Sequence, residues 1–297
     1  MQLKEGGSAP GVGPIHKDEM QATLAPLESA FGVDMFNNML GSAGKKQFSG
    51  DIDVAIQLDK DDIEAFGKTI KDSPLTLFYA KSSVFMTKVK IQDYDPNREF
   101  IDPATGENKG IPEGRTGYVQ VDYMPGDPGW MKTYYHAPNE TDSKYKGVFR
   151  NIMIATICAV YDRDSSEEKL PDGRSVEVER WIWSPSVGLV RIKRTPKPRK
   201  DGVGYTKQHI DTQVQKPIID PDTIAKTLGL TNADDLYSYE TMHKAIKKAY
   251  KPELYQKIID SFARNGVIND IGLPDDVKIS PEAKELNRIK VLAGLQK

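Results

Sequence analysis

The chain has 297 residues, with 38% hydrophobic and 28% charged side chains and a formal net charge of -2, values typical of soluble globular proteins. No apolar run approaches the roughly 20 residues of a membrane-spanning helix, and the first residues lack the basic and apolar segments of a secretory signal. The single cysteine, Cys158, excludes an internal disulfide and a cysteine-rich zinc motif. We therefore expect a cytoplasmic protein with no membrane partner.

The first predicted elements follow a leader. Residues 1–14 are rich in Gly and Pro, which predicts a flexible segment. Apolar residues recur every three to four positions between residues 17 and 40, which predicts one or two amphipathic helices. Residues 51–58 then have the pattern of a strand, and residues 59–71 that of a helix with Asp59 as its N-cap.

Two further strands are predicted at residues 84–91 and 117–124. The long polar stretch between them resembles the extended tip of a hairpin. In the second of these strands one face carries Tyr118, Gln120, Asp122 and Met124, and the other carries Val119, Val121 and Tyr123. Asp122 is therefore the one charged residue on an otherwise neutral strand.

The second half begins with a predicted helix at residues 145–161, followed by a hairpin-like pair of strands around residues 184–188. Residues 193–200 contain five basic residues, no acid and two prolines. We interpret residues 196–220 as a basic linker, with contact to a nucleic acid backbone as the alternative. From residue 221 onward the pattern predicts helices alone, and hence a small helical C-terminal domain at residues 221–297.

The most informative pattern is the acid-apolar-acid sequence of Asp51, Ile52 and Asp53. Side chains at positions i and i+2 of a strand leave the same face, so the two carboxylates project together. Adjacent carboxylates repel each other unless solvent screens them or a hard cation lies between them. Mg²⁺ prefers oxygen ligands of this kind. The pair therefore predicts either a metal site or a solvent-exposed strand end.

Two neighbouring features favour the metal site. A Gly41-Ser42 turn precedes the acid pair, and the isolated Asp122 lies on a later strand. If that strand pairs beside the first one, which ordinary connections permit, Asp122 completes a face of three carboxylates. The turn and the acids together predict a site for a polyphosphate and a metal.

These motifs resemble the nucleotidyltransferase superfamily that includes DNA polymerase beta. The superfamily pattern is Gly-Ser, then acid-apolar-acid, then a third acid downstream, and the chain is similar to it over about residues 31–125. The resemblance implies an α/β (α+β) fold, in which a nucleotidyltransferase-type mixed sheet is flanked by helices. It also implies a catalytic core at residues 15–195, joined through the linker to the helical domain.

The resemblance implies roles for these residues. Asp51, Asp53 and Asp122 would be the catalytic metal ligands for two Mg²⁺ ions, with Mn²⁺ as the alternative ion. The backbone around Gly41 and Ser42 would bind the phosphates of a nucleoside triphosphate such as ATP. The remaining candidates for phosphate contact are the two cations of the same turn, Lys45 and Lys46.

A second likeness to the polymerase beta branch lies downstream, where an aromatic pair and a small turn precede a helix with an aromatic residue and an arginine. It implies that Tyr134, Tyr135, Asn139 and Arg150 hold the sugar and base. The alternative for the tyrosines is packing beneath a loop. The alternative for Arg150 is a surface salt bridge.

The function implied is transfer of a nucleoside monophosphate to an acceptor hydroxyl, with release of pyrophosphate. The favoured acceptor is the 3′ end of a nucleic acid. One alternative is a non-catalytic structural or binding protein that retains the fold, although such a protein has no chemical reason to keep three mutually repelling carboxylates. Another is a toxin-like transferase that modifies RNA or protein.

Overall fold

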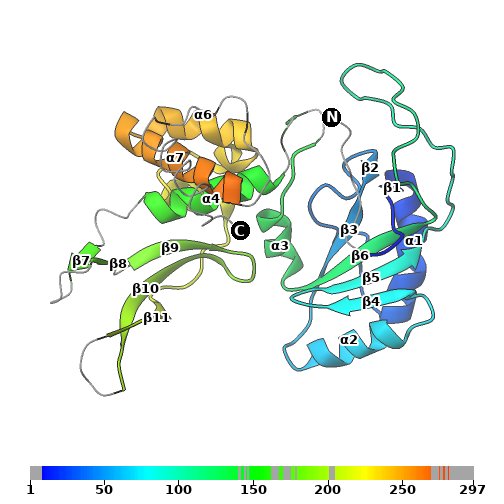
Figure 1. The fold of residues 1–297 in the computed structure, drawn as a ribbon, viewed down its shortest axis with the longest axis horizontal. Coiled ribbons are helices and arrows are strands. Elements are labelled where there is room, and N and C mark those ends of the chain that lie inside the picture. The colour runs from blue at the N-terminus through cyan, green and yellow to red at the C-terminus, as the bar shows by residue number, and fades with distance from the viewer. Residues whose placement is uncertain are drawn as a thin grey trace, which may run out of the picture. The chain divides into compact units, whose positions relative to one another are not determined.

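The computed structural model describes residues 9–139, 142–143, 145, 147–161, 167–169, 175–177, 179–200 and 205–268, together with residues 274, 277 and 280. The chain forms two compact units, Met1–Lys144 and Tyr145–Lys297, and each is described by itself (Figure 1). The fold is mixed α/β, as predicted. Within the part of the chain that is described, no helix is both long enough and apolar enough to cross a membrane.

A four-stranded sheet in the order β3-β6-β5-β4 forms the centre of the first unit (Figure 1). β3 and β6 run parallel, whereas β6 with β5 and β5 with β4 are antiparallel, so the sheet is mixed. The predicted pairing of the later strand beside the first one is therefore confirmed. The strands are β3 (Asp51–Ile56), β4 (Phe78–Lys81), β5 (Phe85–Lys90) and β6 (Tyr118–Pro125).

Two helices cover one face of this sheet, namely α1 (Lys17–Phe31) and α2 (Asp62–Asp72). Every second residue of β3 and β6 is apolar and fully buried, because the side chains of a strand alternate between its faces. The hydrophobic core contains Met20, Leu24, Leu27, Ile52, Val54, Phe66, Ile70, Phe85, Val89, Val119, Val121 and Tyr123. The other face, which we call the open face, carries the polar residues of the same two strands.

Two predicted helix boundaries are wrong. The first helix ends at Gly32, which has a left-handed φ of 68° and donates its N–H to the carbonyl of Glu28 at 2.8 Å, so residues 33–40 are not helical. The second helix starts at Asp62, whose N–H donates to the carbonyl of Asp59 at 3.0 Å. Asp59 therefore lies in the preceding turn and is not the N-cap.

Residues 9–14, which we call the N-terminal segment, are packed rather than flexible. Ala9 is 5% exposed, and its N–H donates to Oε1 of Gln120 at 2.9 Å. Gly13 donates its N–H to the carbonyl of Tyr118 at 2.9 Å. The chain then continues into β1 (Ile15–His16), which pairs with β2 (Phe48–Ser49). The predicted flexible leader is thus wrong for this segment, because β6 provides partners for its backbone.

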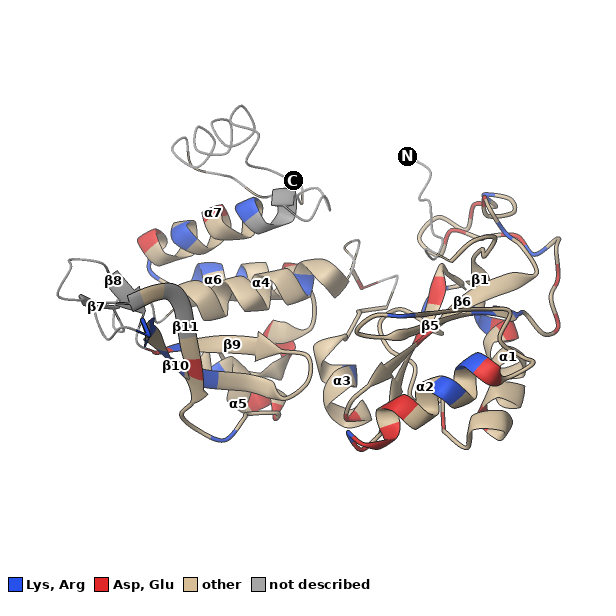
Figure 2. Ribbon diagram, turned by 60° about the horizontal axis from the view of Figure 1, so that its bottom comes forward, with Lys and Arg blue, Asp and Glu red and all other residues tan. Residues whose placement is uncertain are grey.

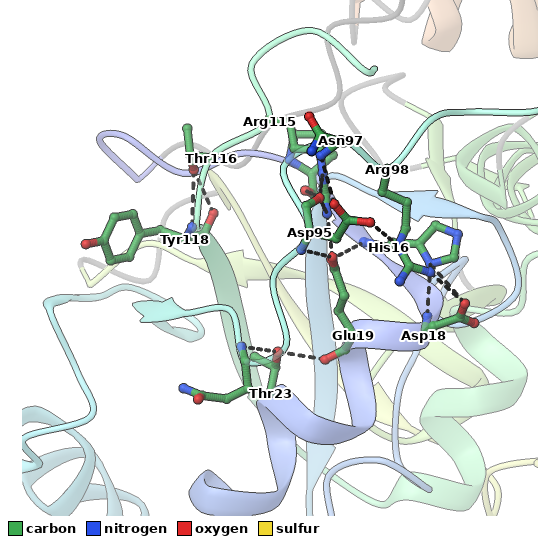
Figure 3. Close-up of polar contacts among 12 residues, drawn as sticks. His16, Asp18, Glu19, Thr23, Asp95, Asn97, Arg98, Arg115, Thr116 and Tyr118 are labelled. Carbon is green, nitrogen blue, oxygen red and sulfur yellow. Dashed lines mark hydrogen bonds and ion pairs between the residues drawn. The ribbon is translucent and has the colours of Figure 1, made fainter. Parts of the chain in front are cut away.

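The loop between β5 and β6 is anchored by Arg115 (Figure 3). Its guanidinium pairs with Glu19 at 2.5 Å, and the two side chains are only 2% and 1% exposed. The same guanidinium donates to the carbonyls of Pro14 at 3.1 Å and Asp95 at 2.8 Å. Its carbon lies 4.8 Å from the centre of the Tyr94 ring. One buried cation therefore joins α1, the N-terminal segment and the loop, and the predicted hairpin connection is confirmed.

The second unit combines helices with a three-stranded antiparallel sheet in the order β11-β10-β9. Its first helix, α4 (Gly147–Val160), packs against β9 and against two of the later helices. The remaining elements are β7 (Glu167–Lys169), β8 (Ser175–Glu177), β9 (Glu179–Ser184), β10 (Gly188–Pro198), β11 (Tyr205–Gln213), α5 (Pro221–Thr227), η2 (Ala233–Leu236), α6 (Tyr239–Ala249) and α7 (Pro252–Ile268).

The predicted domain boundaries need correction, because the helix predicted at residues 145–161 belongs with the C-terminal helices. The second unit thus starts at Tyr145, and the core predicted for residues 15–195 is divided between the two units. The C-terminal helices do not form a separate domain, since α6 and α7 both pack on α4. The helix predicted at residues 283–295 lies outside the described residues.

The predicted basic linker is also wrong, since β10 and β11 both extend into it. β10 pairs with β11 from Ile192 to Pro198, whereas β9 pairs with β10 from Gly188 to Lys193. Pro196 and Pro198 lie past the part of β10 that pairs with β9, and the register with β11 shifts between them. Proline lacks a backbone N–H and is tolerated at such edges and irregularities.

Candidate functional site

Three carboxylates and one amide occupy four adjacent positions on the open face of the first unit. In the parallel pairing of β3 with β6, Asp51 lies opposite Gln120 and Asp53 lies opposite Asp122. Positions two apart on each strand share a face, so the four side chains form the corners of a square. The structure thus places the three predicted metal ligands together.

The carboxylates of this square affect one another. Burial, followed by the charges of Asp51 and Asp122, raises the pKa of Asp53 to about 7. Burial and the charge of Asp51 raise the pKa of Asp122 to about 6, while its hydrogen bond from Gln120 acts in the opposite direction. The cluster is therefore an electrostatically unfavourable arrangement that a positive charge would relieve.

The donor chemistry suits a hard divalent cation, since the candidate ligands are all carboxylate oxygens. As the side chains lie, however, no group of three or more His, Cys, Asp or Glu residues among those described is gathered closely enough to hold a metal ion. Nε2 of Gln120 lies 3.0 and 2.9 Å from the two carboxylate oxygens of Asp122. The cluster fits Mg²⁺ or Mn²⁺ by its charge and ligand type.

The Gly41-Ser42 turn lies against the carboxylates. Gly41 has a left-handed φ of 63°, and a Cβ at this position would lie 3.9 Å from Oδ2 of Asp53. The carbonyl of Ser42 accepts the N–H groups of Lys45 at 3.1 Å and Lys46 at 3.3 Å, which closes a tight turn. The conformation at position 41 favours glycine, and the short distance places the backbone of the turn beside Asp53.

The aromatic segment that follows β6 meets this turn. Gly41 forms a bridge with His136, and Nζ of Lys45 donates to the carbonyl of Ala137 at 2.8 Å. Tyr135 packs against a small cluster of Leu40, Ala55 and Met131. Burial and the charge of Asp53 raise the pKa of Tyr135, so its hydroxyl is near that carboxylate. The structure brings Lys45 and Tyr135 to the edge of the site.

Tyr134 is the last residue of α3 (Pro128–Tyr134), and its ring centre lies 4.8 Å from that of Tyr135. Asn139 is exposed, and its amide donates to Oδ2 of Asp142 at 3.2 Å. These two candidates belong to the same segment as Tyr135. Among their described contacts, neither has one with the three carboxylates.

Arg150 lies in the second unit and is only 4% exposed. Its Nε donates to the carbonyl of Leu236, and its guanidinium carbon lies 6.0 Å from the centre of a Trp183 ring. The surface position weighed for this arginine is therefore wrong. Its described contacts stabilise the packing of α4 within the second unit.

Gln120 is the member of the square that the sequence prediction did not single out. It lies two residues before Asp122 and is 3% exposed. The alternation of β6 had placed it on the same face as Asp122, so the available indication was a polar amide at position i–2 from a candidate metal ligand.

The metal-free protein is expected to lose stability as the pH rises. The unfolded pKa of an Asp is about 3.9, whereas that of Asp53 in the fold is about 7. Between these values the folded state retains a proton that the unfolded state has lost, so the free energy of unfolding falls with increasing pH and levels off above 7. Urea denaturation in EDTA between about pH 4 and 8 should show a decline on the order of 4 kcal/mol from Asp53, to which the raised pKa of Asp122 adds in the same direction. Asp53→Asn should remove the Asp53 part of this decline and leave that of Asp122, and an increase over the same interval would contradict the burial of the Asp53 carboxyl.

Comparisons with known proteins give a distant likeness in fold. No protein family model matches the chain, and no curated protein matches it in sequence. Among solved structures, the chain is similar to the polymerase beta of Leishmania infantum, determined as a ternary gap complex. The two are 12% identical with a TM-score of 0.38, over 76% of this chain and 71% of that chain.

Proposed function

We propose that this protein is a metal-dependent nucleotidyltransferase, which transfers a nucleoside monophosphate from a nucleoside triphosphate to an acceptor hydroxyl. The observation that carries the proposal is the parallel pairing of Asp53 with Asp122, with Asp51 on the same face. A second support is the glycine turn beside them, where backbone can approach phosphate oxygens.

The residues of the open face have distinct roles in this reaction. Divalent cations, when bound, would neutralise phosphate charge and polarise the acceptor hydroxyl. Asp51 and Asp53 hold the nucleotide side of the site, and Asp122 faces the acceptor. The hydroxyl oxygen attacks the α-phosphorus, the bond from that phosphorus to the bridging oxygen breaks, and pyrophosphate leaves. Asp122 accepts the proton of the hydroxyl.

The nucleotide would be held by the elements that meet at Asp53. The turn at Gly41 and Ser42 faces the phosphates, with Lys45 and Lys46 adding positive charge near them. Tyr134 and Tyr135 offer ring faces to the base, since aromatic rings stack on bases with little dependence on sequence. Asn139 and Arg150 stay predictions, because their described contacts serve other partners.

The direct experiment is to incubate the full chain with Mg²⁺ or Mn²⁺, each labelled nucleoside triphosphate and a panel of DNA, RNA, protein and small hydroxyl acceptors. Pyrophosphate release together with label on a nucleic acid 3′ end supports the proposal. Label on a protein, or elsewhere on RNA, would favour a toxin-like transferase. No release with any nucleotide and acceptor would favour a non-catalytic protein that retains the fold.

A nucleic acid is the acceptor class that the second unit favours. Past Lys193, β10 remains paired with β11 but no longer with β9, and we call this part of the two strands the ribbon. Lys193, Lys197 and Lys200 are exposed on or just beyond β10, and Figure 2 shows Lys and Arg along this strand. One nearby cation, Arg194, is paired with Asp211 at 2.9 Å. A basic ribbon of this kind suits the phosphate backbone, which attracts clustered cations independently of sequence.

Reversing the charge of this ribbon should weaken nucleic acid binding. The triple variant Lys193→Glu, Lys197→Glu, Lys200→Glu should lower affinity for single-stranded DNA or RNA by roughly tenfold or more, and should reduce the salt dependence of binding by about two ion equivalents. Fluorescence anisotropy across a salt series measures both quantities.

The matched control reverses three exposed lysines of α6, namely Lys244, Lys247 and Lys248. It changes the net charge equally and should retain most of the affinity. An equal loss in both triple variants would show that net charge, rather than the ribbon, governs binding.

A further inference from the structure

Gln120 connects the N-terminal segment to the third carboxylate. Its side-chain oxygen accepts the N–H of Ala9 at 2.9 Å, and its nitrogen donates to both carboxylate oxygens of Asp122 at 3.0 and 2.9 Å. A backbone N–H can only donate and a carboxylate can only accept, so the two partners fix the orientation of the amide. Gln120 is 3% exposed, and water therefore does not readily replace these bonds.

The far end of this connection is held firmly by the sheet. The N-terminal segment is bound through Gly13 to Tyr118 at 2.9 Å, and the carbonyl of Pro10 accepts from Nζ of Lys88 at 3.0 Å. Lys88 lies opposite Gln120 in the pairing of β5 with β6. The segment thus lies over the end of the open face next to the square, and it braces the amide from the side opposite Asp122.

Nε2 of Gln120 lies at nearly the same distance from both carboxylate oxygens of Asp122. It therefore occupies the position that a cation bound to both oxygens would take. We propose that Gln120, braced by the N-terminal segment, is a positioning residue that holds Asp122 in a closed state, from which the amide must withdraw before a divalent cation binds. This inference rests on the proposed function, because it takes Asp122 as a metal ligand. It agrees with the finding that, among the described residues, no three His, Cys, Asp or Glu side chains are close enough together to hold a metal ion.

The closed state couples the cation to the N-terminal segment. Since the amide bridges Ala9 and Asp122, a cation that displaces it from the carboxylate also weakens its hold on the N–H of Ala9. Coupling of two binding events is reciprocal, so loosening the segment must favour the cation by the same factor. The N-terminal segment therefore sets the affinity of the third carboxylate for metal.

The test measures Mn²⁺ affinity of the full chain by isothermal titration calorimetry, without nucleotide. Gln120→Met keeps the length of the side chain but removes its donor, and should bind Mn²⁺ about tenfold more tightly, the effect expected from losing one hydrogen bond to a charged group. Ala9→Pro removes the N–H that braces the amide and should tighten binding by a smaller factor. Ala9→Gly retains that N–H and should bind as the wild type does.

Hydrogen exchange of the wild type supplies a readout that needs no substitution. The amide of Ala9 should exchange faster when Mn²⁺ is added, while the amide of Gly13 should not change. Unchanged or weaker Mn²⁺ binding in Gln120→Met, or exchange at Ala9 that Mn²⁺ leaves unaltered, would overturn the closed state. Wild-type protein that binds no Mn²⁺, or binds it equally well as Asp53→Asn, would instead refute the metal site and the proposed function with it.

Discussion

Asp53→Asn should lower the rate of pyrophosphate release by about a thousandfold, corresponding to about 4 kcal/mol of transition-state stabilisation. The substitution keeps the shape of the side chain but removes the carboxylate from the corner of the square that lies opposite Asp122 and beside the glycine turn. Initial rates with saturating Mg²⁺ and nucleoside triphosphate measure the loss.

Two controls separate this effect from damage to the fold. Asp72→Asn makes the same chemical change at an exposed position at the end of α2 and should retain full activity. Asp53→Asn should be more stable than the wild type at neutral pH, because it removes a buried carboxyl that its neighbours repel. A variant that is both folded and active would sink the assignment of Asp53.

Arg115→Met should lower the free energy of unfolding by about 3–5 kcal/mol, the range for breaking a buried ion pair. The side chain of Glu19 is 1% exposed, so it would keep a buried charge without its cation. The carbonyl of Pro14 would lose its guanidinium donor, and that of Asp95 would keep only the N–H of Arg98. Urea denaturation at pH 7 measures the change.

Arg98→Met is the matched control for this prediction. Arg98 pairs with Asp18 at 2.8 Å, but the Asp18 side chain is 60% exposed, so water can replace the arginine. The control should therefore cost about 1 kcal/mol or less. An equal loss of unfolding free energy in the two variants would show that burial does not make the Arg115–Glu19 pair more stabilising than the exposed one.

The parts of the site that the sequence predicts are those set by local alternation. The acids of β3 are separated by Ile52, and Asp122 of β6 lies between Val121 and Tyr123. These three hydrophobic neighbours are 0% exposed. Burial of that apolar set on one face leaves the acids on the other, and the strand period of two then fixes which residues stand together. The pairing of the two strands needed only an ordinary connection.

The parts that the sequence does not predict depend on partners distant along the chain. The N-terminal segment has the composition of a flexible leader, and it is ordered by a bond between residues 111 positions apart, Ala9 and Gln120. β10 and β11 contain charges and prolines where a strand pattern would show alternation. The sequence spacing of Arg150 predicts contact with the nucleotide. In the structure its guanidinium instead donates to the carbonyl of Leu236, which lies 86 residues further along the chain.

Because the site depends on the parallel register of β3 and β6, an insertion within a strand would disrupt it, whereas an insertion in a connecting loop would not. Inserting a single residue within β6 before Asp122 would turn its side chain toward the core and bring an apolar neighbour to the open face. Added residues in the loop between β5 and β6 would leave the register unchanged, because the closure entropy of a loop rises only slowly with its length. Related sequences can therefore differ widely in that loop, and the spacing from Gln120 to Asp122 is the feature by which to align them.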